Sequence, residues 1–182
     1  MKKTLVLFFV LLLLPFLLFS GVNARIHFSD ELSYTVYNRI WVSPEEHYYS
    51  VESLIYNPSV CSDIDILVTK NIGLGFGFGF GYQSSIFDFN RFVTIPKSIN
   101  GTINAGIVLK FEQVRLSISA LLRSSLQIAR SNWVSQIGGM VDLSYSFNNG
   151  LTLISSYKYL YNYNMLTSAV SLGLGYTFGG ER

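Results

Sequence analysis

The sequence feature that most constrains the fold is a strict alternation of apolar residues and glycines between residues 72 and 82. The apolar positions are Ile72, Leu74, Phe76, Phe78, Phe80 and Tyr82, and the residues between them are Gly73, Gly75, Gly77, Gly79 and Gly81. Successive side chains of a β-strand point to opposite faces, so this period of two gives one apolar face and one bare face. A helix is disfavoured because each interior glycine costs about 1 kcal/mol. We therefore predict a β-strand.

The same period recurs along the chain, with Gly, Ser, Thr, Asn or an isolated charge on the second face. In all, strands are predicted at 31–42, 63–69, 72–82, 103–111, 114–122, 137–147, 151–161 and 170–178. Tight turns at 70–71, 112–113 and 148–150 alternate with longer links at roughly 43–62, 84–101, 123–135 and 162–168. Segment 47–57 fits either an extension of the second strand or a hairpin in the first loop. Tight turns on one side and long loops on the other are typical of outer-membrane barrels.

The N-terminus predicts export. Lys2 and Lys3 precede an apolar run over 5–19, which is followed by small residues and by Val22 and Ala24 at the −3 and −1 positions of a cleavage site. We predict a signal peptide at 1–24 and one barrel domain at 25–182, of 182 − 24 = 158 residues. Removing the two leader lysines from the 13 basic residues leaves 11 against 11 acidic ones, so no basic excess indicates a nucleic-acid partner.

A soluble, lipocalin-like ligand-binding barrel is the alternative that alternation alone leaves open. Charged residues make up 13% of this chain, against roughly 25% in soluble domains, which favours an apolar face in contact with lipid. Aromatic residues also concentrate near strand ends, as interfacial girdles do: Phe111, Phe147, Tyr176 and Phe178 on the turn side, and Tyr82, Trp133, Tyr159 and Tyr161 on the loop side. We predict an all-β fold, a closed eight-stranded antiparallel up-and-down transmembrane barrel in the bacterial outer membrane.

If the apolar face meets lipid, the other face lines the lumen. The alternation then places eight charges inside: Glu31, Arg39, Asp63, Asp65, Lys110, Arg115, Asp142 and Lys158. Four are acidic and four basic, which indicates a salt-bridged plug in a narrow barrel. The alternative is a narrow polar route for small solutes, along which the glycines at 73–81 keep one wall free of side chains. Those glycines also fit a role in making room for large residues opposite, or in sheet bending.

The strand count, the turn pattern and the last strand resemble the small outer-membrane barrel superfamily of OmpA-, OmpX- and OmpW-type proteins, over about 31–178. The last strand is similar to the superfamily's C-terminal assembly signal, which implies that Ser171, Gly173, Tyr176 and Phe178 engage the barrel-assembly machinery. The tail 179–182 departs from that pattern, because members usually stop at the final aromatic residue. OmpW-like release of an apolar molecule into the membrane needs a greasy lumen, and the inward set offers only a few large apolar residues: Leu67, Val108, Met140, Ile154 and Leu160.

The loops give a second functional hypothesis, an adhesin or host-surface binder. The links at 43–62 and 84–101 are long enough to protrude and to contact a partner, and the second contains Asp88, Asn90, Arg91, Phe92 and Lys97. The expected partners are therefore outer-membrane lipid, the assembly machinery and a surface ligand.

No catalytic, metal or cofactor site is predicted. The histidines are His27 and His47, and His47 lies in the first long link with Glu45, Glu46 and several serines near it in sequence, but nothing fixes a serine within hydrogen-bond reach. With the single Cys61 they form no metal-ligand set, and Cys61 has no disulfide partner within the chain. The Gly-x-Gly repeats alternate within a strand and no helix follows, so they do not indicate a nucleotide loop.

Overall fold

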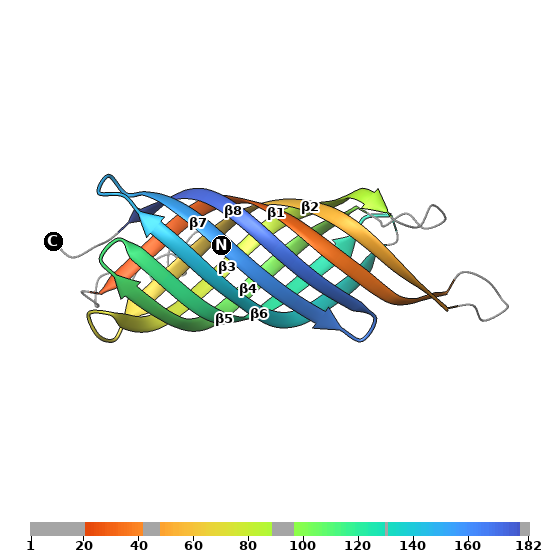
Figure 1. The fold of residues 1–182 in the computed structure, drawn as a ribbon, viewed down its shortest axis with the longest axis horizontal. Coiled ribbons are helices and arrows are strands. Elements are labelled where there is room, and N and C mark those ends of the chain that lie inside the picture. Colours follow the sequence, from red (N-terminus) through yellow and green to blue (C-terminus); the bar gives the residue numbers. More distant parts are fainter. Residues whose placement is uncertain (1–20, 42–47, 89–96, 130, 179–182) are drawn as a thin grey trace, which may run out of the picture.

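The computed structural model describes residues 21–41, 48–88, 97–129 and 131–178, with side chains over the same ranges except 37–51 and 88. Within these ranges no helix is long and apolar enough to cross a membrane. The strands are β1 (Val22–Trp41), β2 (Tyr48–Leu67), β3 (Ile72–Asp88), β4 (Ser98–Phe111), β5 (Val114–Gln127), β6 (Asn132–Ser146), β7 (Leu151–Asn162) and β8 (Met165–Phe178). Each pairs antiparallel with its neighbours and β1 pairs with β8, so the sheet closes into an eight-stranded barrel, as predicted (Figure 1).

The register fixes the tilt of the strands. Following the paired residues from strand to strand once around the barrel leads from Val22 in β1 through all the other strands to Leu32, again in β1. The stagger is therefore 32 − 22 = 10 residues. A closed barrel with such a stagger has strands inclined by about 35–45° to its axis. Figure 1 shows that the strands run obliquely around the barrel. The interior of an eight-stranded barrel is just wide enough for its own side chains.

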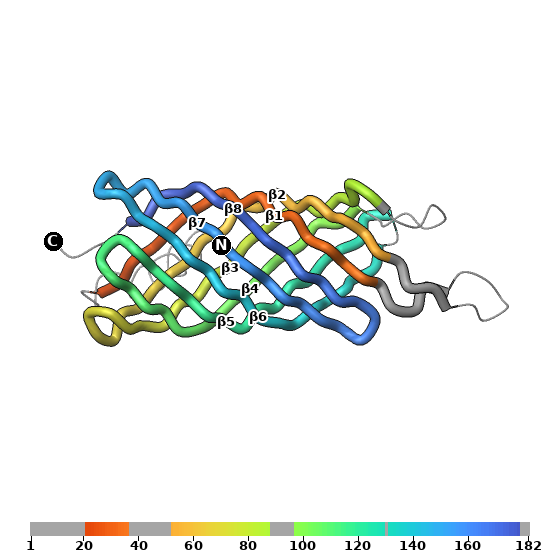
Figure 2. Tube along the Cα trace, in the orientation of Figure 1, coloured from red at the N-terminus to blue at the C-terminus, as the bar shows by residue number. Residues whose placement is uncertain are grey.

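Tight turns connect the strands at one end of the barrel, which we call the turn end, and longer links connect them at the other, the loop end (Figures 1 and 2). The turns follow β2, β4 and β6, as the sequence predicts. Glu112 and Gly150 adopt positive φ angles of 51° and 87° in two of them. Glycine accepts such an angle without strain, so Gly150 suits the turn between β6 and β7.

The predicted loops are too long, because the strands continue beyond the alternating segments. β2 begins at Tyr48, so segment 47–57 belongs mostly to β2 and the link predicted at 43–62 is largely strand. β3 and β4 likewise take residues from the link predicted at 84–101. Backbone pairing continues through these extensions: Trp41 still pairs with Tyr48 near the tip of the β1–β2 hairpin. Polar residues and Pro58 interrupt the alternation in β2, which hid this part of the strand.

β1 also begins earlier than the predicted residue 31. It starts at Val22, and Val22, Asn23 and Ala24 pair with Ile66, Asp65 and Ile64 of β2. The predicted cleavage point after Ala24 therefore lies among the first paired residues of β1. Cleavage there remains a prediction.

The outer face of the barrel is apolar and the inner face is polar. Phe28 and Leu172 are 68% and 67% exposed on the outside, whereas Glu31 in the lumen is fully buried. All eight residues of the predicted girdles are exposed on the outer face. A soluble barrel that carries an apolar ligand has the opposite polarity, so the lipocalin-like alternative does not fit this structure, whereas hydrocarbon matches the outer face.

Candidate functional site: the charged lumen

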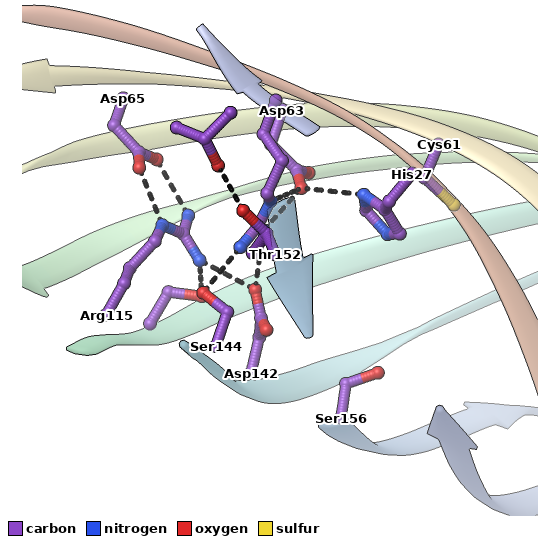
Figure 3. Close-up of polar contacts among 12 residues, drawn as sticks. His27, Cys61, Asp63, Asp65, Arg115, Asp142, Ser144, Thr152 and Ser156 are labelled. Carbon is purple, nitrogen blue, oxygen red and sulfur yellow. Dashed lines mark hydrogen bonds and ion pairs between the residues drawn. The ribbon is translucent and has the colours of Figure 1, made fainter. Parts of the chain in front are cut away.

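A cluster of five charged residues, the lower cluster, crosses the lumen towards the turn end. From β1, Arg25 Nη2 donates to Asp63 Oδ2 of β2 at 2.5 Å and to Asp142 Oδ2 of β6 at 2.8 Å. From β5, Arg115 binds Asp65 with both Nε (2.6 Å) and Nη2 (2.7 Å), and its Nη1 donates to Asp142 Oδ2 at 2.6 Å. Figure 3 shows Arg115 held between Asp65 and Asp142. Asp142 therefore joins two arginines from opposite sides of the barrel into one network.

A second group, the upper cluster, lies nearer the loop end. Arg123 Nη2 of β5 donates to both carboxylate oxygens of Glu31, at 2.7 and 2.6 Å. Lys158 Nζ of β7 donates to Glu31 Oε2 at 2.7 Å. The side chains of Glu31 and Arg123 are 0% and 2% exposed. Three strands are thus tied together across the lumen by one carboxylate.

The two clusters complement each other in charge. The lower cluster has two arginines and three aspartates, and the upper cluster has one glutamate with one arginine and one lysine. With His27 neutral, their formal charges are 2 − 3 = −1 and 2 − 1 = +1, so the sum is zero. Buried ions are tolerated when they are paired, and every charged group of the two clusters has a partner of opposite sign.

The space between the clusters is small. A cavity of about 30 Å³ lies there, with His27, Cys61, Asn104, Met140 and Ser156 among its lining residues. His27 Nδ1 is 3.5 Å from Asp63 Oδ2, and Figure 3 shows its ring beside Cys61 and facing Asp63. A volume of this size corresponds to about one water molecule and leaves no room for a solute.

Uncharged hydrogen bonds close the lumen further towards the loop end. Asn100 Nδ2 of β4 donates to Asn57 Oδ1 of β2 at 2.8 Å. The Gln136 amide of β6 donates to Thr167 Oγ1 of β8 at 3.0 Å, and Thr167 is 3.0 Å from the hydroxyl of Thr35. All five side chains belong to buried residues, so the closure continues above the upper cluster.

Among the residues that the structure describes, the turn end is open. A cup of about 560 Å³ lies inside this rim, lined by residues that include Arg25, Lys110, Glu112, Arg115 and Tyr176. Lys110 Nζ is 3.5 Å from Asn23 Oδ1 at this end. The lower cluster separates the cup from the rest of the lumen.

The structure places most of the predicted lumen charges inside the barrel. Buried are Glu31, Asp63, Asp65, Asp142 and Lys158. The Arg115 side chain is 12% exposed, and Lys110 is half-buried near the cup. The side chain of Arg39 lies outside the described residues, as do His47 and the tail 179–182.

Sequence reasoning missed Arg25, His27 and Arg123, which all face the lumen. The predicted first strand begins at residue 31 and the predicted fifth strand ends at 122, so these residues lie outside the predicted strands. The missed signal is parity. Arg25 and His27 have the same odd–even phase as Glu31, and Arg123 has the same phase as Ser117 and Ser119.

The glycines of β3 face the lumen, and neighbouring side chains fill the space beside them. A methyl group at Gly75 would lie 2.6 Å from Val108 Cγ2, and one at Gly81 would lie 2.6 Å from Asn57 Oδ1. The row is therefore no bare wall of a channel: the glycines make room for larger side chains from β2 and β4.

The predicted assembly-signal residues divide between the two faces of β8. Ser171 is buried in the lumen and Gly173 packs against the β1 backbone, whereas Tyr176 and Phe178 are exposed on the outside. The rings of Tyr176 and Phe178 are 4.9 Å apart between centroids. Their contact with the assembly machinery stays a prediction.

Of the greasy residues predicted to face inward, Val108, Ile154 and Leu160 are buried, and Leu67 and Met140 are partly exposed. They are scattered among ion pairs and form no continuous apolar path. Among the described residues, no three His, Cys, Asp or Glu side chains are grouped so that they could hold a metal ion.

Solved structures of similar fold complete this description. No family model and no curated protein matches the chain. The solid-state NMR structure of outer membrane protein AlkL in lipid bilayers matches with 14% identity over 90% of this chain and 93% of that one, at a TM-score of 0.51. The chain has the fold of the small outer-membrane barrels.

Two more members of this group match equally well. Neisserial surface protein A is 15% identical over 87% of this chain and 98% of that one, with a TM-score of 0.51. Ail, the attachment invasion locus protein of Yersinia pestis, in complex with the heparin analogue sucrose octasulfate, is 15% identical over 87% and 99%, with a TM-score of 0.50. The resemblance to small eight-stranded outer-membrane barrels that the sequence predicts is thereby confirmed.

Proposed function

We propose that this chain is an exported outer-membrane barrel with a sealed lumen, and that it works as a structural scaffold for interactions at the cell surface. The observation that carries the proposal is the lumen itself. Two ion-pair clusters and a layer of hydrogen bonds fill it, and the cavity between the clusters measures only about 30 Å³. Because such a barrel has no free passage, its two ends are the surfaces available for function.

The loop end offers the larger of these surfaces. β1 and β2 each have 20 residues, compared with 12 in β7 and 14 in β8. Figure 1 shows their hairpin extending past the other strands. In outer-membrane barrels the tight turns face the periplasm and the longer loops face outward, which would put this hairpin on the cell surface. Ail, of similar fold, is named for attachment and invasion.

The experiment shortens the hairpin while keeping the barrel. Residues 38–50 are replaced by an Asn-Gly turn, so that Tyr37 and Val51 remain the last pair of β1 and β2. A non-adherent bacterial host displaying the full chain should attach to cultured epithelial cells, and the shortened variant should lose most of that attachment. The matched control replaces 128–131, between β5 and β6, with the same turn and should keep it.

Heat-modifiable gel mobility would verify that each variant is folded. Equal attachment of the shortened variant and the full chain would overturn the surface role of the hairpin. Unchanged attachment together with loss of small-solute uptake would support the second candidate, a narrow polar route. The open cup of about 560 Å³ at the turn end favours that candidate, because it resembles the entrance of such a route.

A further inference from the structure

Asp30 is an unusual residue on the outside of this barrel. It lies in β1 between the exposed Phe28 and Leu32, and pairs with Pro58 of β2 and Leu172 of β8. Among strand residues with described side chains, only Asp30 and Glu52 are charged and face outward. Glu52 pairs with Val36, nearer the loop end than the outward-facing Tyr34 and Tyr56. Asp30 lies on the membrane side of those tyrosines, so a carboxylate is exposed within the apolar band.

The structure gives Asp30 one polar partner. The Tyr56 hydroxyl donates a hydrogen bond of 2.6 Å to Asp30 Oδ1. No described residue within reach provides a positive charge, because the described strand arginines and lysines point into the lumen. A charged residue on the lipid face destabilises a barrel unless it is paired or reaches the interface, which makes this position a candidate site for an external cationic partner.

A groove lies beside this carboxylate. It has a volume of about 480 Å³, and its lining residues include Phe28, Asp30, Pro58, Val60, Phe80 and Tyr82. The cause of the groove is local. β2 and β3 are paired at Tyr56–Ser84 and again at Ser59–Gly81, with no pair at Asn57 or Pro58. Proline has no N–H to donate and is disfavoured inside a sheet, so it interrupts the β2–β3 ladder there.

The groove does not lead into the lumen. Behind Pro58, the Asn57 side chain accepts the hydrogen bond from Asn100, and both residues are 2% exposed. The groove is therefore a closed, mostly apolar depression on the lipid face, with one carboxylate at its side near the loop-end interface. An acyl chain matches the depression, and a positively charged headgroup matches the carboxylate.

We propose that the groove binds a phospholipid whose headgroup ammonium donates hydrogen bonds to Asp30 while one acyl chain lies between Pro58 and Phe80. The ammonium gives the Asp30 carboxylate a second hydrogen-bond partner besides the Tyr56 hydroxyl. A quaternary trimethylammonium has the same charge but no N–H donor, so it binds this carboxylate less well. The site thus selects phosphatidylethanolamine over phosphatidylcholine.

The test uses the full mature chain, refolded into bilayer discs with equal amounts of dioleoyl phosphatidylethanolamine and dioleoyl phosphatidylcholine. Native mass spectrometry then counts the lipids that remain bound on release. The expected enrichment of phosphatidylethanolamine is about two- to fivefold, the range for an ion pair at the edge of water. In Asp30→Asn it should fall to about onefold. Glu52→Gln, which removes the other outward acid, should keep the wild-type enrichment.

Tyr56→Phe separates the contribution of the Asp30 carboxylate from that of the neighbouring hydroxyl. It keeps the charge and removes the internal donor, so the enrichment should stay at the wild-type value or rise. No enrichment with the wild-type chain, or equal enrichment with Asp30→Asn, would overturn the proposal. The result is independent of the surface role, because a barrel that lost attachment with its hairpin would still show this lipid preference.

Discussion

Glu31 is the residue on which the upper cluster depends. Its fully buried carboxylate accepts hydrogen bonds from Arg123 and Lys158, on strands β5 and β7. Removing one member of a buried ion pair leaves the partner charge without compensation, and the cost of that is larger than the net value of the pair. Two cations depend on this single acid, so its loss leaves both without a counter-charge.

We expect Glu31→Gln to lower the free energy of unfolding by about 3–5 kcal/mol, because Arg123 and Lys158 would remain buried without a counter-charge. Urea unfolding in lipid vesicles, followed by tryptophan fluorescence, measures the change. Ser33→Ala is the matched control: Ser33 is also buried in β1, but its described contact is a long 3.5 Å hydrogen bond to the Ile55 carbonyl. The control should lose less than about 1.5 kcal/mol. Equal losses in the two variants would contradict this account of the upper cluster.

At the scale of the element, β3 shows why its glycines alternate so strictly. The space beside these inward-facing glycines is filled by side chains from β2 and β4. The apolar residues between the glycines face outward. Close packing on the inside makes an added methyl group costly there.

Gly75→Ala tests this packing. The new methyl group would lie 2.6 Å from Val108 Cγ2, and Val108 is fully buried, so we expect a loss of about 1–3 kcal/mol in the free energy of unfolding. Gly101→Ala in β4 is the matched variant, because its methyl group points outward and its nearest atom, in Phe80, is 3.8 Å away. That variant should be neutral or slightly stabilising. If the same urea titration gave equal losses at both positions, close packing would not explain the β3 glycines.

The strands also show how much of the fold can be predicted from the sequence. Alternation predicts all the strands, the tight turns and the inward direction of most lumen charges, because the period of two is a property of each strand alone. Alternation does not predict the strand ends, because strands continue where the apolar alternation stops. β2 continues through Asn57 and Pro58 because it pairs with β1, and this pairing cannot be read from the local sequence pattern. Alternation also does not predict which charges pair in the lumen. Arg25 and Asp142, for example, meet only because the sheet closes into a barrel with a given stagger.

For the whole molecule, the important arrangement is two clusters in series along one narrow lumen. Each has a formal charge that the other balances, and each spans the barrel from strand to strand. A passage requires that both be opened, together with the hydrogen-bonded layer above the upper cluster, because each of these barriers alone closes the route. The seal is therefore redundant, and single changes are predicted to be poor tests of it.

Conductance in planar bilayers can reveal this redundancy. Arg115→Ala with Asp65→Ala removes one charge-balanced pair from the lower cluster, and Glu31→Ala with Arg123→Ala removes one from the upper cluster. All of these cluster substitutions are made in a background of Asn100→Ala and Gln136→Ala, which removes the hydrogen-bonded layer above the upper cluster. In that background we expect the chain with intact clusters and both double variants to show almost no channel steps, like the wild-type chain, while the quadruple variant conducts reproducibly, since only there are all the barriers widened. Each preparation must first show heat-modifiable mobility. Steps from the wild-type chain would overturn the sealed lumen, and steps from either double variant as large as those of the quadruple one would show that a single cluster closes the barrel.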